Sequence, residues 1–131
     1  MNIIPSPTGA ASALGLVIPS LKGKMDGNAL RVPTPTGSVV DLTLELSRNV
    51  TVEEINKVLQ DNENEVLKFT FDPVVSSDII GSSLGALVDG LLTDVLEVDG
   101  KQLVKVVAWY DNEMGYSNQM VRTAKYLMSK M

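Results

Sequence analysis

The sequence contains neither cysteine nor histidine. Without cysteine, the chain can form no disulfide, no thiolate nucleophile and no thiolate metal site. Without histidine, it lacks imidazole acid–base chemistry and the commonest protein ligand for metal ions. Catalysis through a sulfur nucleophile or a histidine base is therefore excluded for these 131 residues taken alone.

Basic residues and long apolar runs are also scarce. The net charge is −5 and only three arginines are present, namely Arg31, Arg48 and Arg122. No basic stripe suited to a phosphate backbone can be assembled from them, so we expect no nucleic-acid partner. The longest apolar stretch, at residues 9 to 18, is about half of what a membrane span needs. No charged and then apolar leader follows Met1, so we expect no secretory signal and a cytoplasmic location.

The composition that remains is that of a folded protein. Apolar residues make up 44% of the chain and charged residues 21%, a balance typical of globular rather than disordered chains. A chain of this length buries roughly two-thirds of the surface that it exposes when unfolded. We therefore expect a single domain over residues 1–131.

Hydrophobic periodicity and turn residues predict the elements of the first half. Residues 9 to 18, GAASALGLVI, predict a short helix that Pro19 ends. Residues 28 to 46 alternate apolar and polar side chains and predict two strands with a break at Pro33 to Gly37. Residues 51 to 60, TVEEINKVLQ, predict a helix whose first residues have the spacing of a capping box.

The second half predicts strands and a terminal helix. VLKFTF, at residues 66 to 71, predicts a strand. Residues 84 to 111 contain Asp-Gly pairs at 89–90 and 99–100, which predict two hairpin turns and hence a three-stranded antiparallel meander. A helix follows over about residues 113–130, with an apolar stripe. The predicted class is α+β, an antiparallel or mixed sheet with helices on one face.

Two segments near the N-terminus carry residues suited to phosphate. Thr8 and Gly9 precede the first expected helix, where bare backbone N–H groups and the positive end of the helix dipole favour an anion. Arg31 lies on an expected strand, and its guanidinium can donate two hydrogen bonds to phosphate oxygens. The alternatives are that Thr8 only caps the helix, that Gly9 only permits the turn, and that Arg31 is a solvated surface residue.

A third candidate is WYDNEMGYSN, at residues 109 to 118. Asp111 suits a helix N-terminus by its charge, and Asn112 is a good helix cap. The Asn112 amide can also pair with another carboxamide, such as that of nicotinamide. Tyr110 and Tyr116 can provide flat apolar walls for a ring. The alternative is a capped helix whose aromatic side chains pack against the protein.

Several segments together resemble the catalytic domain of the glyceraldehyde-3-phosphate dehydrogenase family. The longest is NIIPSPTGAASALGLVIPSLKGKMDGNALRVPTPTGSVVDLT, and VVSSD and VAWYDNEMGYSN follow it in the family's order. The similarity runs from Asn2 to the C-terminus, and a collinear series is far more specific than any one motif. It implies an α+β C-terminal domain with a mixed sheet, whose last helix packs against a nucleotide-binding domain.

The resemblance also implies roles for five residues. Thr8 and Gly9 match positions that help to bind inorganic phosphate. Arg31 matches the arginine that contacts the phosphate of the substrate. Asn112 matches the asparagine that holds the carboxamide of NAD, and Tyr116 matches a tyrosine near the nicotinamide ring. Family members are normally homotetramers.

The sequence departs from the family at two positions and lacks two of its features. Pro7 stands where serine or threonine is usual and removes a backbone donor beside the phosphate site, and Ser12 replaces a frequent lysine. The family's chemistry needs a cysteine, which forms a thiohemiacetal and then a thioester, and a histidine that activates it. Neither residue is present. The glycine fingerprint of a dinucleotide-binding domain is also missing.

These observations leave three interpretations. In the first, the chain is a fragment of a glycolytic glyceraldehyde-3-phosphate dehydrogenase that is inactive and binds no NAD tightly by itself. Its partners would be a missing N-terminal NAD-binding part and neighbouring subunits. In the second, the parent is an erythrose-4-phosphate dehydrogenase, which shares the fold. In the third, the chain is a non-enzymatic module that binds a partner or self-associates through the apolar stripe of its last helix. No metal or membrane partner is expected.

The chain alone is expected to show no thiol-dependent dehydrogenase activity, because no residue in it can form the sulfur–carbon bond. The measurement is NADH formation with glyceraldehyde 3-phosphate, NAD and phosphate, using purified residues 1–131. Turnover that persists after removal of contaminating enzyme would contradict this prediction.

Overall fold

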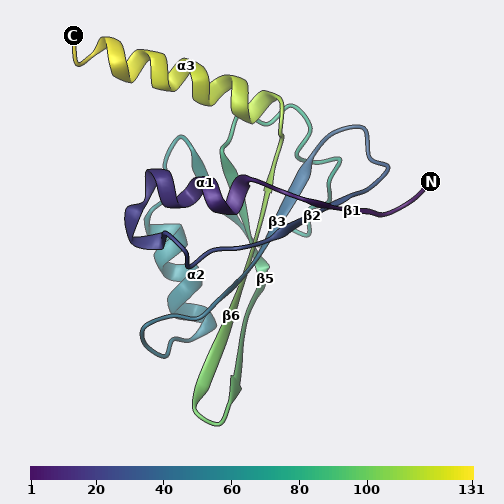
Figure 1. Ribbon diagram of the computed structural model, residues 1–131, viewed down its shortest axis with the longest axis vertical. Coiled ribbons are helices and arrows are strands. Elements are labelled where there is room, and N and C mark those ends of the chain that lie inside the picture. Colours follow the sequence, from purple (N-terminus) through teal and green to yellow (C-terminus); the bar gives the residue numbers. More distant parts are fainter. The chain divides into compact units, whose positions relative to one another are not determined.

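The computed structural model describes all residues from Met1 to Met131 and has an α+β fold, as the sequence predicted. The chain divides into two compact units, a first unit over Met1–Pro35 and a second unit over Thr36–Met131. Figure 1 shows the chain traced from N- to C-terminus. The expectation of one domain over residues 1–131 stays a prediction. No helix combines the length and the apolar composition that a membrane span requires.

The first unit is built on a two-stranded antiparallel ladder. Its elements are β1 (Ile4–Pro7), α1 (Ala10–Val17), the short 3₁₀ helix η1 (Pro19–Leu21) and β2 (Asn28–Arg31). β1 was not predicted, because two of its four residues are proline. Proline is tolerated here since a two-stranded ladder leaves one side of each strand free of hydrogen bonds. The helix expected at residues 9 to 18 is confirmed, and it ends before Pro19 as predicted.

The second unit contains a four-stranded mixed sheet with the order β3-β6-β5-β4. Its strands are β3 (Ser38–Leu44), β4 (Leu67–Thr70), β5 (Ala86–Val98) and β6 (Lys101–Tyr110). β4 and β5 run parallel, while β6 pairs antiparallel with both β3 and β5. The two predicted strands at 28 to 46 are confirmed as β2 and β3, and the strand predicted at 66 to 71 is confirmed as β4.

The predicted three-stranded meander is wrong, because Asp89-Gly90 is not a hairpin turn. β5 runs through this pair as one strand, with a shift of register against β6 between Asp89 and Asp94. Asp89 is 3% exposed and accepts hydrogen bonds from the Leu91 N–H and the Trp109 Nε1–H, each at 3.1 Å. A buried carboxylate held by two donors fixes a bulged strand here instead of a reversal.

Gly90 is required at the bulge by close packing. A Cβ atom at this position would lie 2.7 Å from Cε1 of Phe69 and 2.9 Å from Cε1 of Phe71. The two phenylalanine rings pack edge to face, with centroids 4.9 Å apart, and leave no room for a side chain. The carbonyl of Gly90 also accepts a hydrogen bond from Asn56 Nδ2 at 3.3 Å. This bond joins the bulge to the helix α2 (Val52–Asp61), in which Asn56 lies.

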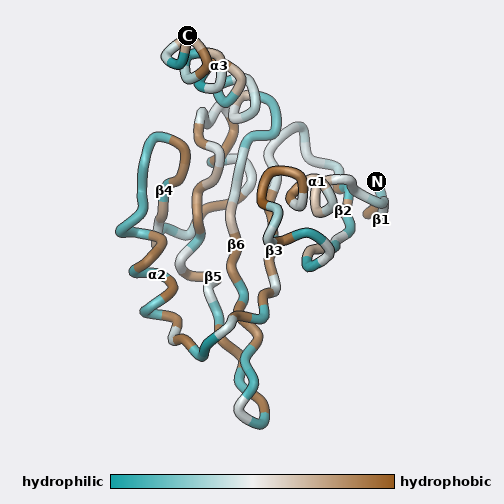
Figure 2. The backbone as a smooth tube through the Cα atoms, turned by 60° about the vertical axis from the view of Figure 1, so that its left-hand side comes forward, coloured by the Kyte–Doolittle hydropathy of each residue, from teal (hydrophilic) through white to brown (hydrophobic).

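The second Asp-Gly pair forms the predicted hairpin turn between β5 and β6. Asp99 and Gly100 have φ of 51° and 74°. Positive φ at both central residues is the geometry of a type I′ turn, whose twist matches that of the flanking strands. Figure 2 shows hydrophobic and hydrophilic residues alternating along this hairpin.

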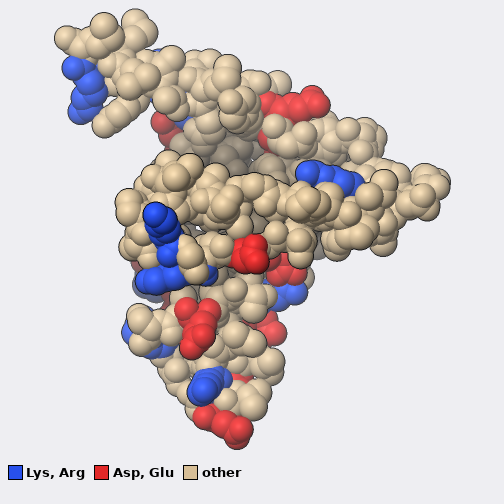
Figure 3. All heavy atoms as spheres, in the orientation of Figure 1, with Lys and Arg blue, Asp and Glu red and all other residues tan.

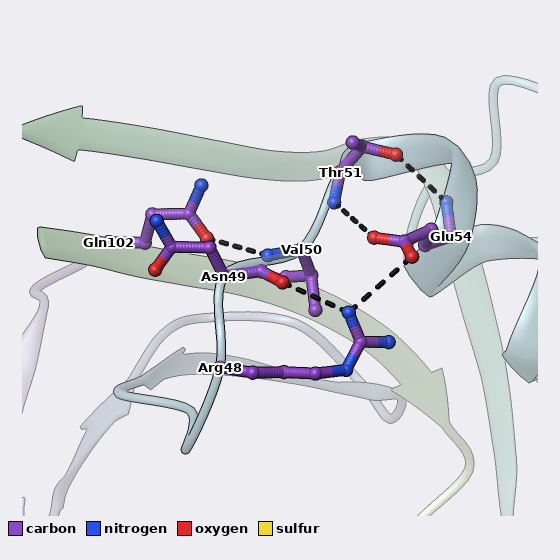
Figure 4. A network of polar contacts seen from close by, with 6 residues as sticks. All are labelled: Arg48, Asn49, Val50, Thr51, Glu54 and Gln102. Carbon is purple, nitrogen blue, oxygen red and sulfur yellow. Dashed lines mark hydrogen bonds and ion pairs between the residues drawn. The ribbon is translucent and has the colours of Figure 1, made fainter. Parts of the chain in front are cut away.

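The helix α2 (Val52–Asp61) packs on β5 and β4 and begins with the predicted capping box. The Glu54 N–H donates to Thr51 Oγ1 at 3.2 Å, and Glu54 Oε2 accepts the Thr51 N–H at 2.9 Å. Immediately before them, the Val50 N–H donates to Gln102 Oε1 on β6 at 2.8 Å. Figure 4 shows how this network ties the start of the helix to the sheet.

The helix α3 (Met114–Met128) confirms the terminal helix expected at about residues 113–130. Its first turn packs closely, since a Cβ on Gly115 would lie 2.6 Å from the carbonyl oxygen of Leu84. Further along, Arg122 donates to the carbonyl oxygens of Ser83 and Glu65, both at 3.0 Å. Beyond these contacts the predicted apolar stripe is exposed, and its members are Val121, Ala124, Met128 and Met131.

Replacing Gly90 by alanine is expected to lower the free energy of unfolding by about 1–3 kcal/mol, because the new methyl group forces the Phe69 ring to move. Urea unfolding followed by the fluorescence of Trp109, the single tryptophan, measures the change. Gly27→Ala is the control, since nothing lies within 4 Å of its Cβ position. Its effect should stay within about 0.5 kcal/mol. Equal effects of the two substitutions would contradict the packing argument.

Candidate functional site

Thr8 and Gly9 lie where β1 gives way to α1. Thr8 Oγ1 accepts the Ala10 N–H at 3.2 Å, and the carbonyl of Gly9 accepts the first intrahelical bond, from the Ala13 N–H at 3.0 Å. Ser12 Oγ also donates to the Gly9 carbonyl, at 2.9 Å. The predicted turn is present, but Thr8 is not the helix cap: Gly9 occupies the N-cap position of α1, and no side chain caps the helix there. The remaining N–H groups of the first helical turn have no acceptor within the helix, as at any helix start.

Arg31 is the last residue of β2 and lies at the other end of the ladder from Thr8. In the register of the two strands Ile4 faces Arg31, whereas Pro7, which precedes Thr8, faces Asn28. Three steps along a strand at roughly 3.3 Å each place the Ile4–Arg31 pair about 10 Å from the Pro7–Asn28 pair, and Thr8 lies one residue beyond Pro7. Arg31 is exposed and its guanidinium makes no hydrogen bond or ion pair. Arg31 and the pair Thr8–Gly9 therefore form two separate candidate anion positions.

Asn112 lies in the second unit, between the end of β6 and the start of α3. Because Ser38 pairs with Tyr110 at the end of the sheet, the start of β3 reaches the same place. The hydroxyls of Thr36 and Ser38 each donate to Asn112 Oδ1 at 3.4 Å. Asn112 Nδ2 has no acceptor and the side chain is exposed, so its two amide donors are free for a ligand.

The tyrosines beside Asn112 differ in their surroundings. Tyr116 is 66% exposed at the beginning of α3, four residues after Asn112, so the alternative of a fully packed aromatic cluster does not hold for it. Tyr110 is half-buried at the end of β6. Asn112 and Tyr116 therefore come to one end of the second unit, where an exposed ring and an exposed amide are available.

Asp111 caps the turn that leads into α3, whose N-cap position is Glu113, whereas the sequence pattern made Asn112 the candidate cap. Asp111 Oδ1 accepts the N–H groups of Glu113 and Met114 at 2.8 and 2.9 Å. Its other oxygen, Oδ2, accepts the Gly81 N–H at 2.8 Å from a loop thirty residues earlier. Sequence reasoning could not choose between Asp111 and Asn112, because aspartate and asparagine have similar preferences at a cap. It missed the link to Gly81 because a contact over thirty residues has no local signal.

The three hydrogen bonds also set the ionisation of Asp111. The backbone N–H groups of Gly81, Met114 and Glu113, in that order of effect, hold the pKa of the Asp111 carboxyl below its ordinary value. They stabilise the carboxylate and not the neutral acid. Asp111 therefore carries a negative charge at the positive end of the α3 dipole, which is favourable.

Charges elsewhere form no concentrated site. No group of three or more carboxylates lies close enough to hold a metal ion. On the face shown in Figure 3, lysine and arginine side chains occur singly or in small groups, with acidic and uncharged ones around them. The ion pairs, such as Lys105–Asp41 at 2.9 Å on the sheet, are exposed. Exposed pairs of this kind contribute little to stability.

Comparison with known proteins agrees with the resemblance seen in the sequence. A family model described as the C-terminal domain of glyceraldehyde 3-phosphate dehydrogenase matches residues 1–112. The chain belongs to this family. Glyceraldehyde-3-phosphate dehydrogenase of Streptococcus pyogenes is 58% identical over 125 residues, which are 95% of this chain. The enzyme of Clostridium pasteurianum is 56% identical over 126 residues.

The chain is much shorter than these relatives. It spans 37% of the length of the Streptococcus pyogenes enzyme and 38% of that of Clostridium pasteurianum. The roles of Thr8, Gly9, Arg31, Asn112 and Tyr116 therefore stay predictions.

Asp111→Asn is expected to destabilise the second unit in a pH-dependent way. A carboxyl whose pKa is lowered in the folded state stabilises the fold above its unfolded pKa of about 4, and this contribution is lost as the pH falls through the lowered pKa. Urea unfolding should therefore show a large difference between wild type and variant at pH 7. The difference should shrink as the pH falls below the unfolded pKa and through the lowered pKa of the folded state. A difference that is independent of pH would contradict the assignment.

Proposed function

We propose that the chain is the C-terminal part of a phosphorylating, NAD-dependent glyceraldehyde-3-phosphate dehydrogenase. Such an enzyme oxidises glyceraldehyde 3-phosphate, with NAD and inorganic phosphate, to 1,3-bisphosphoglycerate in the cytoplasm. The observation that carries the proposal is the 58% identity to a dehydrogenase of this name over 95% of the chain. The free amide of Asn112 supports it independently.

The first unit is proposed to bind the two phosphates of the reaction. Thr8 and Gly9 would receive inorganic phosphate at the start of α1, where unpaired backbone N–H groups and the helix dipole favour an anion. Arg31 would grip the phosphate of the substrate with its free guanidinium. Their separation at opposite ends of the β1–β2 ladder supports two sites instead of one.

The second unit is proposed to bind the nicotinamide end of NAD, which accepts a hydride when bound. The residues present fit a carboxamide ligand, because Asn112 Nδ2 offers two unused donors beside an acceptor already contacted by two hydroxyls. Asn112 would fix the rotation of the carboxamide. The exposed ring of Tyr116 would cover a face or edge of the flat heterocycle and exclude water from it.

The nucleophile and the base must come from outside these residues. The family's cysteine and histidine, and its dinucleotide-binding domain, are proposed to lie in a preceding part of a longer polypeptide. The present residues would then orient the substrate and cofactor against them. Further subunits, four in the proposed homotetramer, would complete the assembly.

The exposed apolar stripe of α3 favours a second candidate function, self-association. Val121 is 54% exposed and Met128 is 75% exposed, and contiguous apolar surface of this kind promotes association. Sedimentation analysis of residues 1–131 separates the candidates. A monomer at all concentrations would remove the second one.

A joined chain tests the first candidate. The part of the Streptococcus pyogenes enzyme that precedes its match to this chain is placed before Met1, and the product is expected to reduce NAD with glyceraldehyde 3-phosphate. In this joined chain, Asn112→Ala should raise the KM for NAD about tenfold, the value of one hydrogen bond. Arg31→Ala should instead raise the KM for the aldehyde about tenfold or more.

The matched control is Arg48→Ala in the joined chain. Arg48 is an exposed arginine that pairs with Glu54 at 3.4 Å and has no proposed role in the site. It should leave both KM values unchanged. An unsubstituted joined chain that folds but does not reduce NAD with glyceraldehyde 3-phosphate would count against the proposed function.

A further inference from the structure

The carboxylate of Asp111 joins two segments of the second unit that are distant in sequence. It is 4% exposed and divides its two oxygens between them. Oδ1 accepts the N–H groups of Glu113 and Met114 at the start of α3, and Oδ2 accepts the N–H of Gly81. Gly81 has a φ of +81°, so this donor is presented by a backbone conformation that other residues rarely adopt.

Asn112 is the residue held between these contacts. The residue before it anchors both segments, and the residue after it donates its N–H to the same carboxylate. The Asn112 side chain takes no part in capping, so its amide is not consumed by the helix. Its only hydrogen bonds are the long ones from the hydroxyls of Thr36 and Ser38. The direction of the amide therefore depends mainly on how firmly its backbone is fixed.

We propose that Asp111 is a positioning residue for recognition of the nicotinamide carboxamide. Asp111 does not touch the cofactor. It fixes the peptide that carries Asn112, so that Nδ2 is directed outward before a ligand arrives. Fixing a group in its bound direction reduces the ordering cost of binding. The inference rests on the proposed function, because Asn112 must be the group that binds the carboxamide.

A purely structural role for Asp111, as a helix cap, makes a different prediction. Serine is also a good cap and accepts a hydrogen bond from the start of a helix. Its single short hydroxyl cannot reach both α3 and Gly81. The variant Asp111→Ser therefore keeps α3 and breaks only the link between the two segments.

The first test is kinetic and uses the joined chain described above. Asp111→Ser should raise the KM for NAD about tenfold, while the KM for glyceraldehyde 3-phosphate stays within about twofold and the helical circular dichroism is retained. The control is Asp94→Ser, because Asp94 is an exposed carboxylate that accepts only the N–H of its neighbour Val95. It should change neither KM. Equal rises in both KM values for Asp111→Ser would show general damage and overturn the inference.

The second test uses residues 1–131 and needs no cofactor. The side-chain amide of Asn112 gives a pair of signals in a ¹⁵N–¹H correlation spectrum, assigned by their loss in Asn112→Ala. In Asp111→Ser this pair should move towards the position of a freely rotating amide, while Asp94→Ser leaves it in place. An unmoved pair would overturn the inference whatever the kinetics show.

The two tests separate failure of the inference from failure of the proposed function. If the signals of Asn112 move but Asn112→Ala leaves the KM for NAD unchanged, the carboxamide assignment is wrong. The proposed role of Asp111 in cofactor recognition falls with it. If Asn112→Ala raises this KM but Asp111→Ser does not, the proposed function stands and the role of Asp111 is refuted.

Discussion

Pairing of β6 on both of its edges is the constraint on which the second unit depends. β3 and β5 each form an antiparallel ladder with this strand, and its residues Val104 and Val107 are nearly inaccessible to water. A strand hydrogen-bonded on both sides has few ways to move. Because β6 ends at Tyr110, the residues that follow it leave the sheet from its most restricted strand. The candidate cofactor residues are therefore attached to the firmest part of the sheet.

The sequence predicted local structure well where interactions between neighbouring residues determine the conformation. The capping box at Thr51 and the turn at Asp99-Gly100 involve only neighbouring residues, and both are present. The dipeptide Asp89-Gly90 is identical in sequence to the second turn but lies inside a strand. Its conformation is decided by Trp109, Phe69 and Phe71, which no local pattern reveals.

The residues of the candidate site could be predicted from the sequence, but the role of each residue could not. The residue types at Thr8, Arg31 and Asn112 indicate phosphate and amide recognition, and family resemblance adds specificity. The structure adds that the two anion positions are separate and that capping belongs to Asp111. Asp111 and Asn112 are adjacent, and their side chains differ only in having a carboxylate or an amide. Helix-capping preference alone could therefore not assign one to the helix and the other to a ligand.

The pairing of Ser38 with Tyr110 has a consequence for folding during synthesis on the ribosome. A ribosome releases β3 long before β6, so β3 has no partner in its sheet until nearly all of the chain has emerged. Strand pairs that are far apart in sequence form slowly. Until they form, unpaired strand edges can aggregate. Nascent chains of this domain would therefore gain from a chaperone until the last strand arrives.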